Sequence, residues 1–116
     1  MSEIRRIGVT GHLSQAVVHD GRVYLSGVVA RTGDSVAEQT ADVLEQIDAL
    51  LAEAGTDRSR LLSANIWLTD IATWDELNEV WSGWVVPGSP PARATVEARL
   101  AGPDYRVEIM VTAALR

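Results

Sequence analysis

The chain has 116 residues, a formal net charge of −6 at pH 7 and no cysteine, so disulfides, thiolate metal sites and cysteine nucleophiles are excluded. All ten basic residues are arginines, which excludes lysine Schiff-base chemistry, and the acidic balance argues against binding to phosphate backbones. The length fits one domain over residues 1–116, and neither a signal peptide nor a membrane-spanning run is visible. We therefore expect a single cytoplasmic domain.

The first predicted element is a β-hairpin over residues 17–27. β-prone residues flank Asp20-Gly21, a strong signal for a two-residue turn. Residues 32–35 then break the chain, and Asp34 or Ser35 is placed to cap a following helix.

Two helices and one strand are predicted in the middle of the chain. Residues 36–54 follow a helical period that Gly55 ends, with the apolar stripe Val36, Thr40, Val43, Leu44, Ile47, Leu50 and Leu51. Residues 62–69 alternate as a strand, with Trp67 on its less apolar face. A second helix ends at about Trp84, and we expect its tryptophans to lie in the core. Its stripe is Trp74, Leu77, Trp81, Trp84 and Val85.

The last quarter of the chain predicts two strands separated from the second helix by a proline-rich loop. Arg93 and Glu108 are expected on the sheet face opposite the helices. A guanidinium can hold a carboxylate bidentately, and a nearby glutamate can orient a water or move a proton. The residues expected to face the helices are Ala94, Val96, Ala98 and Leu100 in the first strand and Val107, Ile109, Val111, Ala113 and Leu115 in the second.

The element order β-β-α-β-α-β-β predicts an α+β fold with a mixed sheet and both helices on one face. The strand before each helix should run parallel to the strand after it, through a right-handed crossover. The other sheet face, with Trp67, Thr95 and Met110, then lacks cover, which indicates self-association. We expect a homo-oligomer with Arg93 and Glu108 at or near the interface.

Seven short motifs lie along almost the whole chain, and each is weak individually. They are Ser14-Gln15-Ala16-Val17-Val18, Tyr24-Leu25-Ser26-Gly27, Glu38-Gln39-Thr40, Trp67-Leu68-Thr69-Asp70, Leu77-Asn78-Glu79-Val80-Trp81, Pro91-Ala92-Arg93-Ala94-Thr95-Val96-Glu97 and Val107-Glu108-Ile109. In this order and spacing they together resemble the Rid (reactive intermediate deaminase) family, also called YjgF or RidA. The segment at residues 84–86 and the short loop before Arg93 look more like the YoaB-like branch than the RidA branch.

The resemblance implies a chorismate-mutase-like fold that forms homotrimers with ligand clefts between subunits. It also implies hydrolysis of reactive 2-imino or enamine acids to 2-oxo acids and ammonia. The ligand would be a small imine or 2-oxo acid that bears a carboxylate, and neither a metal nor an organic cofactor is implied.

Carried over residue by residue, the resemblance assigns catalytic roles to Arg93, which would bind the carboxylate, and to Glu108, which would orient the hydrolytic water. Substrate-binding roles would fall to Ser26, Gly27 and Asn78 in the cleft. Thr95 replaces a frequent cysteine whose backbone helps to polarise substrate or water.

Two departures from the RidA pattern make the cleft more apolar. Leu13 replaces a cleft tyrosine, and Met110 stands where a second glutamate often follows Glu108. They leave open a non-catalytic trimer that binds carboxylate metabolites or regulates a partner. A third alternative is the endoribonuclease or translation-inhibitor role that family members also carry, against which the acidic charge argues. Arg93 also has a purely structural alternative, a pair with Glu97 or Glu108 on the sheet.

Overall fold

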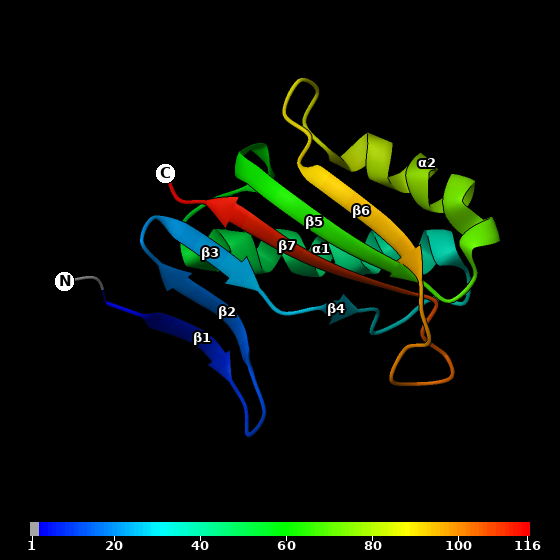
Figure 1. The fold of residues 1–116 in the computed structure, drawn as a ribbon, viewed down its shortest axis with the longest axis horizontal. Coiled ribbons are helices and arrows are strands. Elements are labelled where there is room, and N and C mark those ends of the chain that lie inside the picture. The colour runs from blue at the N-terminus through cyan, green and yellow to red at the C-terminus, as the bar shows by residue number, and fades with distance from the viewer. Residues whose placement is uncertain (1–2) are drawn as a thin grey trace.

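One twisted mixed sheet and two α-helices make up the computed structural model, which describes residues 3–116 (Figure 1). The elements along the chain are β1 (Arg5–Val9), β2 (Ser14–His19), β3 (Arg22–Leu25), β4 (Val28–Val29), α1 (Val36–Ala54), the 3₁₀ turn η1 (Arg58–Arg60), β5 (Leu61–Leu68), the 3₁₀ turn η2 (Ile71–Thr73), α2 (Trp74–Trp84), β6 (Ala92–Glu97) and β7 (Val107–Ala114). The predicted α+β class, with its mixed sheet and two helices, is confirmed.

The sheet order is β1-β2-β3-β7-β5-β6, and β4 follows β3 along the same side of β7. Among the strands of residues 3–116, only β5 and β6 pair in parallel, and α2 connects them, as the crossover rule predicts. Strands β4 and β5 both run antiparallel to β7, so the α1 connection between them also joins strands of the same direction. The strands β1 and β6 are left at the two edges.

Local sequence signals explain where the predicted elements begin and end. Asp20 and Gly21 both have positive φ values, 53° and 76°, as the tight turn between β2 and β3 requires. Ser35 caps α1 by accepting a hydrogen bond from the Glu38 N–H, and the Glu38 side chain accepts in return from the Ser35 backbone. Gly55 ends α1 in the left-handed region.

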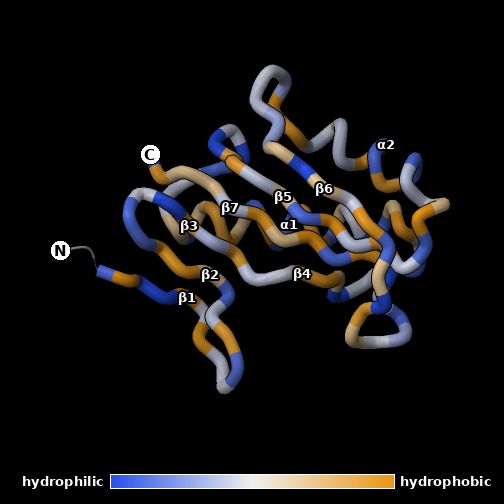
Figure 2. The backbone as a smooth tube through the Cα atoms, in the orientation of Figure 1, coloured by the Kyte–Doolittle hydropathy of each residue, from blue (hydrophilic) through white to orange (hydrophobic). Residues whose placement is uncertain are grey.

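The core lies between α1 and the sheet, and it leaves one sheet face without cover. Helix α1 packs on β2, β3, β4 and β7, and α2 packs beside α1. In Figure 2, hydrophobic stretches recur along β2 and β7, two of the strands on which α1 packs. The Cα extents of 46 × 37 × 20 Å fit two layers, helices and sheet, and no third. The uncovered side, called the open face below, carries the apolar side chains of Val17, Tyr24, Trp67, Val96 and Met110.

Two features of the fold differ from the sequence-based expectation. Strand β1 and the two-residue β4 were not predicted. Trp81 and Trp84 are buried as expected, but Trp74 is 41% exposed, so its assignment to the core was wrong. Among the helices formed by residues 3–116, none has both the length and the hydrophobicity to cross a membrane.

Candidate functional site

Glu108 projects onto the open face beside an irregularity in the neighbouring strand. The pairing of β3 with β7 reaches Tyr24↔Thr112, and β4 resumes it at Val28↔Ile109. Between these two pairs the β3–β4 segment advances four residues, from 24 to 28, whereas β7 advances only three, from 112 to 109. The extra residue is a β-bulge, a device that redirects side chains. It falls at the predicted Ser26-Gly27 pair.

The bulge makes room for the Glu108 carboxylate. A Cβ atom on Gly27 would overlap Oε2 of Glu108 and lie 3.0 Å from its Cδ, so only glycine permits this close approach. The Ser26 N–H donates to the Gln15 carbonyl at 2.9 Å, which ties the bulge to β2. Leu13 precedes Gln15 by two residues and is 49% exposed, so this replacement for the tyrosine lies at the same end of β2.

Arg93 is held by side chains of α2. Its Nη1 donates to Asn78 Oδ1 at 2.7 Å, and its guanidinium carbon lies 5.1 Å from the ring centroid of Trp74 and 5.5 Å from that of Trp81. The three partners are spaced four and three residues apart, which places them on one face of the helix. Burial lowers the pKa of the Arg93 guanidinium, but an arginine remains charged at neutral pH.

Within the described residues, neither charge is neutralised by another side chain. The ion pairs formed within residues 3–116 include neither Arg93 nor Glu108. Glu97, a possible partner of Arg93, instead accepts a hydrogen bond from the Ile71 N–H at 3.1 Å. In the part of the chain that the structure describes, Arg93 therefore forms an ion pair with neither Glu97 nor Glu108.

The predicted facing of β6 was wrong, and Arg93 and Glu108 lie on opposite faces of the sheet. Arg93 pairs with Ala64, which is buried on the helix side, and directly paired residues of parallel strands point the same way. Val96, expected to face the helices, instead pairs with Trp67 on the open face and is 51% exposed. At this edge of the sheet the side chains of α2 that face β6 are polar or aromatic and contact Arg93. The apolar residues of β6 therefore do not identify the side that the helix covers.

The sequence-predicted residues therefore form two groups within one chain. The Arg93 group consists of Arg93, Asn78 and Thr95 on the helix side, where the buried Thr95 Oγ1 has no hydrogen-bond partner within the described chain. The Glu108 group consists of Glu108, Ser26 and Gly27 on the open face. One chain does not bring the two groups together.

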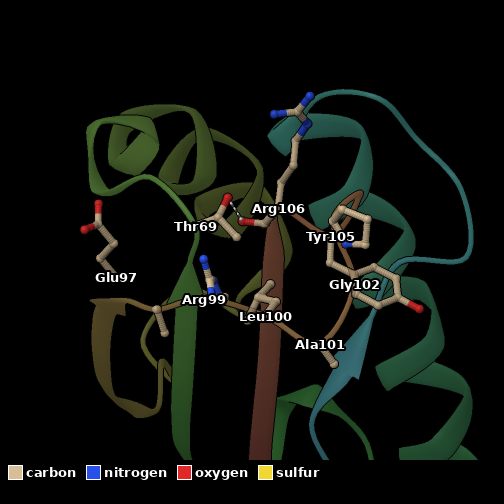
Figure 3. Close-up of a pocket in the computed structure, with 10 residues that line it drawn as sticks. Thr69, Glu97, Arg99, Leu100, Ala101, Gly102, Tyr105 and Arg106 are labelled. Atoms are coloured by element: carbon tan, nitrogen blue, oxygen red, sulfur yellow. Dashed lines mark hydrogen bonds between the residues drawn. The ribbon is translucent and has the colours of Figure 1, made fainter.

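A cavity of about 670 Å³ lies apart from both groups, at the loop between β6 and β7 (Figure 3). Arg99 points toward Thr69 there, whereas Arg106 extends away and donates from Nε to the Asp34 carbonyl at 2.6 Å. The two guanidinium groups thus do not converge on one point, and the cavity offers no second carboxylate clamp.

Sequence reasoning missed residues that position both groups. It placed Trp74 and Trp81 in the core, although their spacing around Asn78 could have marked all three as partners of one side chain. It gave no structural role to Gln39, which is buried and accepts from the Arg106 N–H at 2.8 Å while donating to the Asp104 carbonyl at 2.8 Å. Gln39 thereby fixes the loop that leads into β7 and Glu108.

The fold and the two groups define a small α+β protein with an open sheet face and an unneutralised arginine. The family profile described as Endoribonuclease L-PSP matches residues 3–115. The chain is 40% identical to the RutC family protein YoaB of Escherichia coli K12, over 97% of this chain and 98% of that one. It is 32% identical to the chloroplastic Reactive Intermediate Deaminase A of Arabidopsis thaliana, over 90% of this chain and 59% of that one.

A solved structure gives the same result. A YjgF-family protein of Neisseria meningitidis superimposes with a TM-score of 0.97 at 52% sequence identity, covering 98% of this chain and 96% of that one. The chain belongs to the Endoribonuclease L-PSP family, also known as Rid or YjgF, and within it is YoaB-like.

Proposed function

We propose that this protein hydrolyses 2-imino and enamine acids to 2-oxo acids and ammonia in clefts between the subunits of a homotrimer. The observation that carries the proposal is the state of Arg93. Its guanidinium is oriented by two indole rings, and its hydrogen-bond partner within the described chain is the neutral amide of Asn78. A partly buried cation without a counter-ion suits a site for a small carboxylate. The deaminase name of the Arabidopsis relative supports the same reaction.

The opposite facing of the two groups supports a site between subunits. Because Arg93 and Glu108 lie on different faces of one sheet, one substrate can contact both only if they come from different chains. The apolar open face around Trp67 and Met110 offers a surface for that association. In the proposed trimer, the Arg93 group of one subunit completes the Glu108 group of its neighbour.

The proposed reaction needs little chemistry from the protein. Arg93 binds the carboxylate, and backbone groups near Ser26 and Thr95 polarise the C=N bond. Glu108 takes a proton from a water whose oxygen bonds to C2, and the C=N electron pair moves to the nitrogen, which is protonated. The C–N bond then breaks, the hydroxyl loses its proton to form the carbonyl, and ammonia leaves. The net change is imino acid plus water to 2-oxo acid plus ammonia.

The direct test measures ammonia release from imines that an amino-acid oxidase generates in the assay. Wild type should accelerate release above the spontaneous rate, and Arg93→Ala should lower that acceleration about 100-fold, because the substrate is no longer positioned. Arg99→Ala is the matched control, since Arg99 also lies in the β6 region but lines the separate cavity. No acceleration by a folded wild-type trimer would contradict the proposal.

Assembly is tested separately by light scattering. We expect a mass of three chains in solution, because the open face needs a partner. A clean monomer would contradict the cleft, since one chain does not bring Arg93 and Glu108 together.

The apolar replacements at Leu13 and Met110 favour a second candidate, a trimer that binds carboxylate metabolites without turnover. A wild-type protein that binds 2-oxo acids but never accelerates imine hydrolysis would support it. The endoribonuclease role that the family description names is disfavoured by the net charge of −6 and the absence of lysine. Salt-dependent RNA binding would revive that role.

A further inference from the structure

Trp74 is the unusual member of the aromatic set on α2. Trp81 and Trp84 are 6% and 7% exposed and pack on each other with ring centroids 5.3 Å apart. Trp74 is 41% exposed, although its ring lies closer to the Arg93 guanidinium than that of Trp81 does. A large exposed indole beside an unneutralised arginine is apolar surface placed next to a candidate anion site.

The geometry of the guanidinium determines where a bound acid would lie. Asn78 occupies one N–H of Nη1, whereas Nε and Nη2 of Arg93 have no hydrogen-bond partner within residues 3–116. A carboxylate binds such a free edge in the plane of the guanidinium. The Arg93 guanidinium carbon lies over the Trp74 ring, 5.1 Å from its centroid, and the two-ring system is wider than the guanidinium. The exposed part of the indole is therefore apolar surface beside an acid bound to Arg93.

We infer that Trp74 determines which acids the Arg93 site accepts, by forming an apolar wall against the side chain of the bound acid. The class favoured is 2-imino and 2-oxo acids with bulky apolar side chains, over those with a single methyl group. Burying such a side chain against an indole removes apolar surface from water on both partners. The inference rests on the proposed carboxylate-binding role of Arg93 but does not depend on turnover.

The test compares the affinities of two stable 2-oxo acids for the assembled protein by isothermal titration calorimetry. Pyruvate carries a methyl side chain, and 4-methyl-2-oxopentanoate carries a branched four-carbon one. We expect wild type to bind the larger acid about tenfold more tightly. Trp74→Ala should reduce this ratio to about one, whatever affinity for pyruvate is lost together with the indole contact to Arg93. Trp74→Phe should keep most of the preference, because it keeps an aromatic face.

Val9→Ala serves as the control, since it truncates another exposed apolar side chain on β1, at the opposite edge of the sheet from β6. It should leave the affinity ratio unchanged. A ratio that survives in Trp74→Ala overturns the inference. An equal loss for both acids also overturns it, because Trp74 would then only position Arg93.

The failure of this inference is distinguishable from the failure of the proposed function. Selective binding that depends on Trp74, without acceleration of imine hydrolysis, leaves the inference standing and removes the hydrolase. Imine hydrolysis without any preference between the two acids leaves the hydrolase standing and removes the inference about Trp74. If wild type binds neither acid, the carboxylate-binding role of Arg93 fails, and the inference about Trp74 fails with it.

Discussion

The Arg93 group and the Glu108 group are positioned in opposite ways. Arg93 is held by contacts, with two indoles against its guanidinium and the Asn78 amide on Nη1. Glu108 lies in a space left open for it: the neighbouring β3–β4 segment has a bulge, and Gly27 in that bulge has no Cβ that would overlap the carboxylate. A side chain that anchors a ligand benefits from fixed orientation. A carboxylate that moves a proton must keep its oxygens free. The fixed orientation of Arg93 and the open space around Glu108 therefore each suit the proposed role.

Separation of the two charges has its own consequence. An arginine and a glutamate side by side on one sheet face would form a charge-assisted hydrogen bond and neutralise each other. Placing them on opposite faces leaves both available in every chain. The same arrangement makes the proposed site depend on assembly, and this dependence gives the sharpest experiment.

Mixed trimers should recover activity that neither parent has. Arg93→Ala and Glu108→Gln are each expected to be inactive in imine hydrolysis. If a site takes Arg93 from one chain and Glu108 from its neighbour, random mixing of equal amounts leaves about a quarter of the sites intact. Unfolding and refolding the two variants together should therefore restore about a quarter of wild-type activity.

The control for this experiment mixes two variants that damage the same group, Glu108→Gln and Gly27→Ala. No site in such a mixture has an intact Glu108 group, so the activity should stay at the level of the parents. Absence of recovery in the first mixture, with mixed trimers demonstrated by mass spectrometry, would contradict a site shared between subunits.

Gly27→Ala should separate activity from stability. The added methyl group overlaps Glu108 Oε2, the far end of a flexible side chain, so the carboxylate turns away at little cost in folding. We expect imine hydrolysis to fall about 100-fold, because the proton acceptor is displaced. The midpoint of urea unfolding should change little.

Gly83→Ala is the matched comparison, because a Cβ there meets no atom within 4 Å and the residue lies in α2. It should raise the free energy of unfolding by up to about 1 kcal/mol through helix propensity and leave activity unchanged. Full activity in Gly27→Ala would mean that the position of Glu108 does not matter for the reaction.

Sequence alone predicted the parts of the fold that have local or periodic signals. The turn at Asp20-Gly21, the cap at Ser35 and the stripe of α1 each follow from chemistry within a few residues. The facing of β6 did not follow, because this edge strand turns its apolar residues Ala92, Ala94 and Val96 to the open face and its polar residues to the helix side. The direction is decided by its register against β5, a long-range property that no local pattern records.

The candidate residues were predictable from the family resemblance, but their arrangement was not. The sequence places Arg93 and Glu108 on two neighbouring predicted strands, which suggested one shared face. The structure inserts β5 between those strands, so β6 pairs with β5 and not with β7. The role of Trp74 was missed because its spacing along the helix is that of a core residue. Only the register of β6, which puts Arg93 on the helix side, shows that Trp74 contacts Arg93 and does not lie in the core.

Thr95→Val gives the smallest expected effect and tests how the Arg93 group is used. The buried Oγ1 of Thr95 has no hydrogen-bond partner within the described chain, and an unsatisfied buried hydroxyl destabilises a protein by about 1–3 kcal/mol. Valine keeps the shape and removes the hydroxyl, so unfolding should require about 1 kcal/mol more, measured by urea denaturation. Thr95→Ser keeps the hydroxyl and should not gain stability.

Imine hydrolysis by Thr95→Val should stay within about twofold of wild type, because the proposed mechanism uses only the backbone at this position. A large loss of activity in an intact Thr95→Val trimer would contradict this use of the backbone alone. The Thr95 hydroxyl would then contact the substrate, the water or the neighbouring subunit. Its lack of a partner within one chain would be explained by a bond that forms only in the assembled site, and the Arg93 group would contribute to the chemistry as well as to binding.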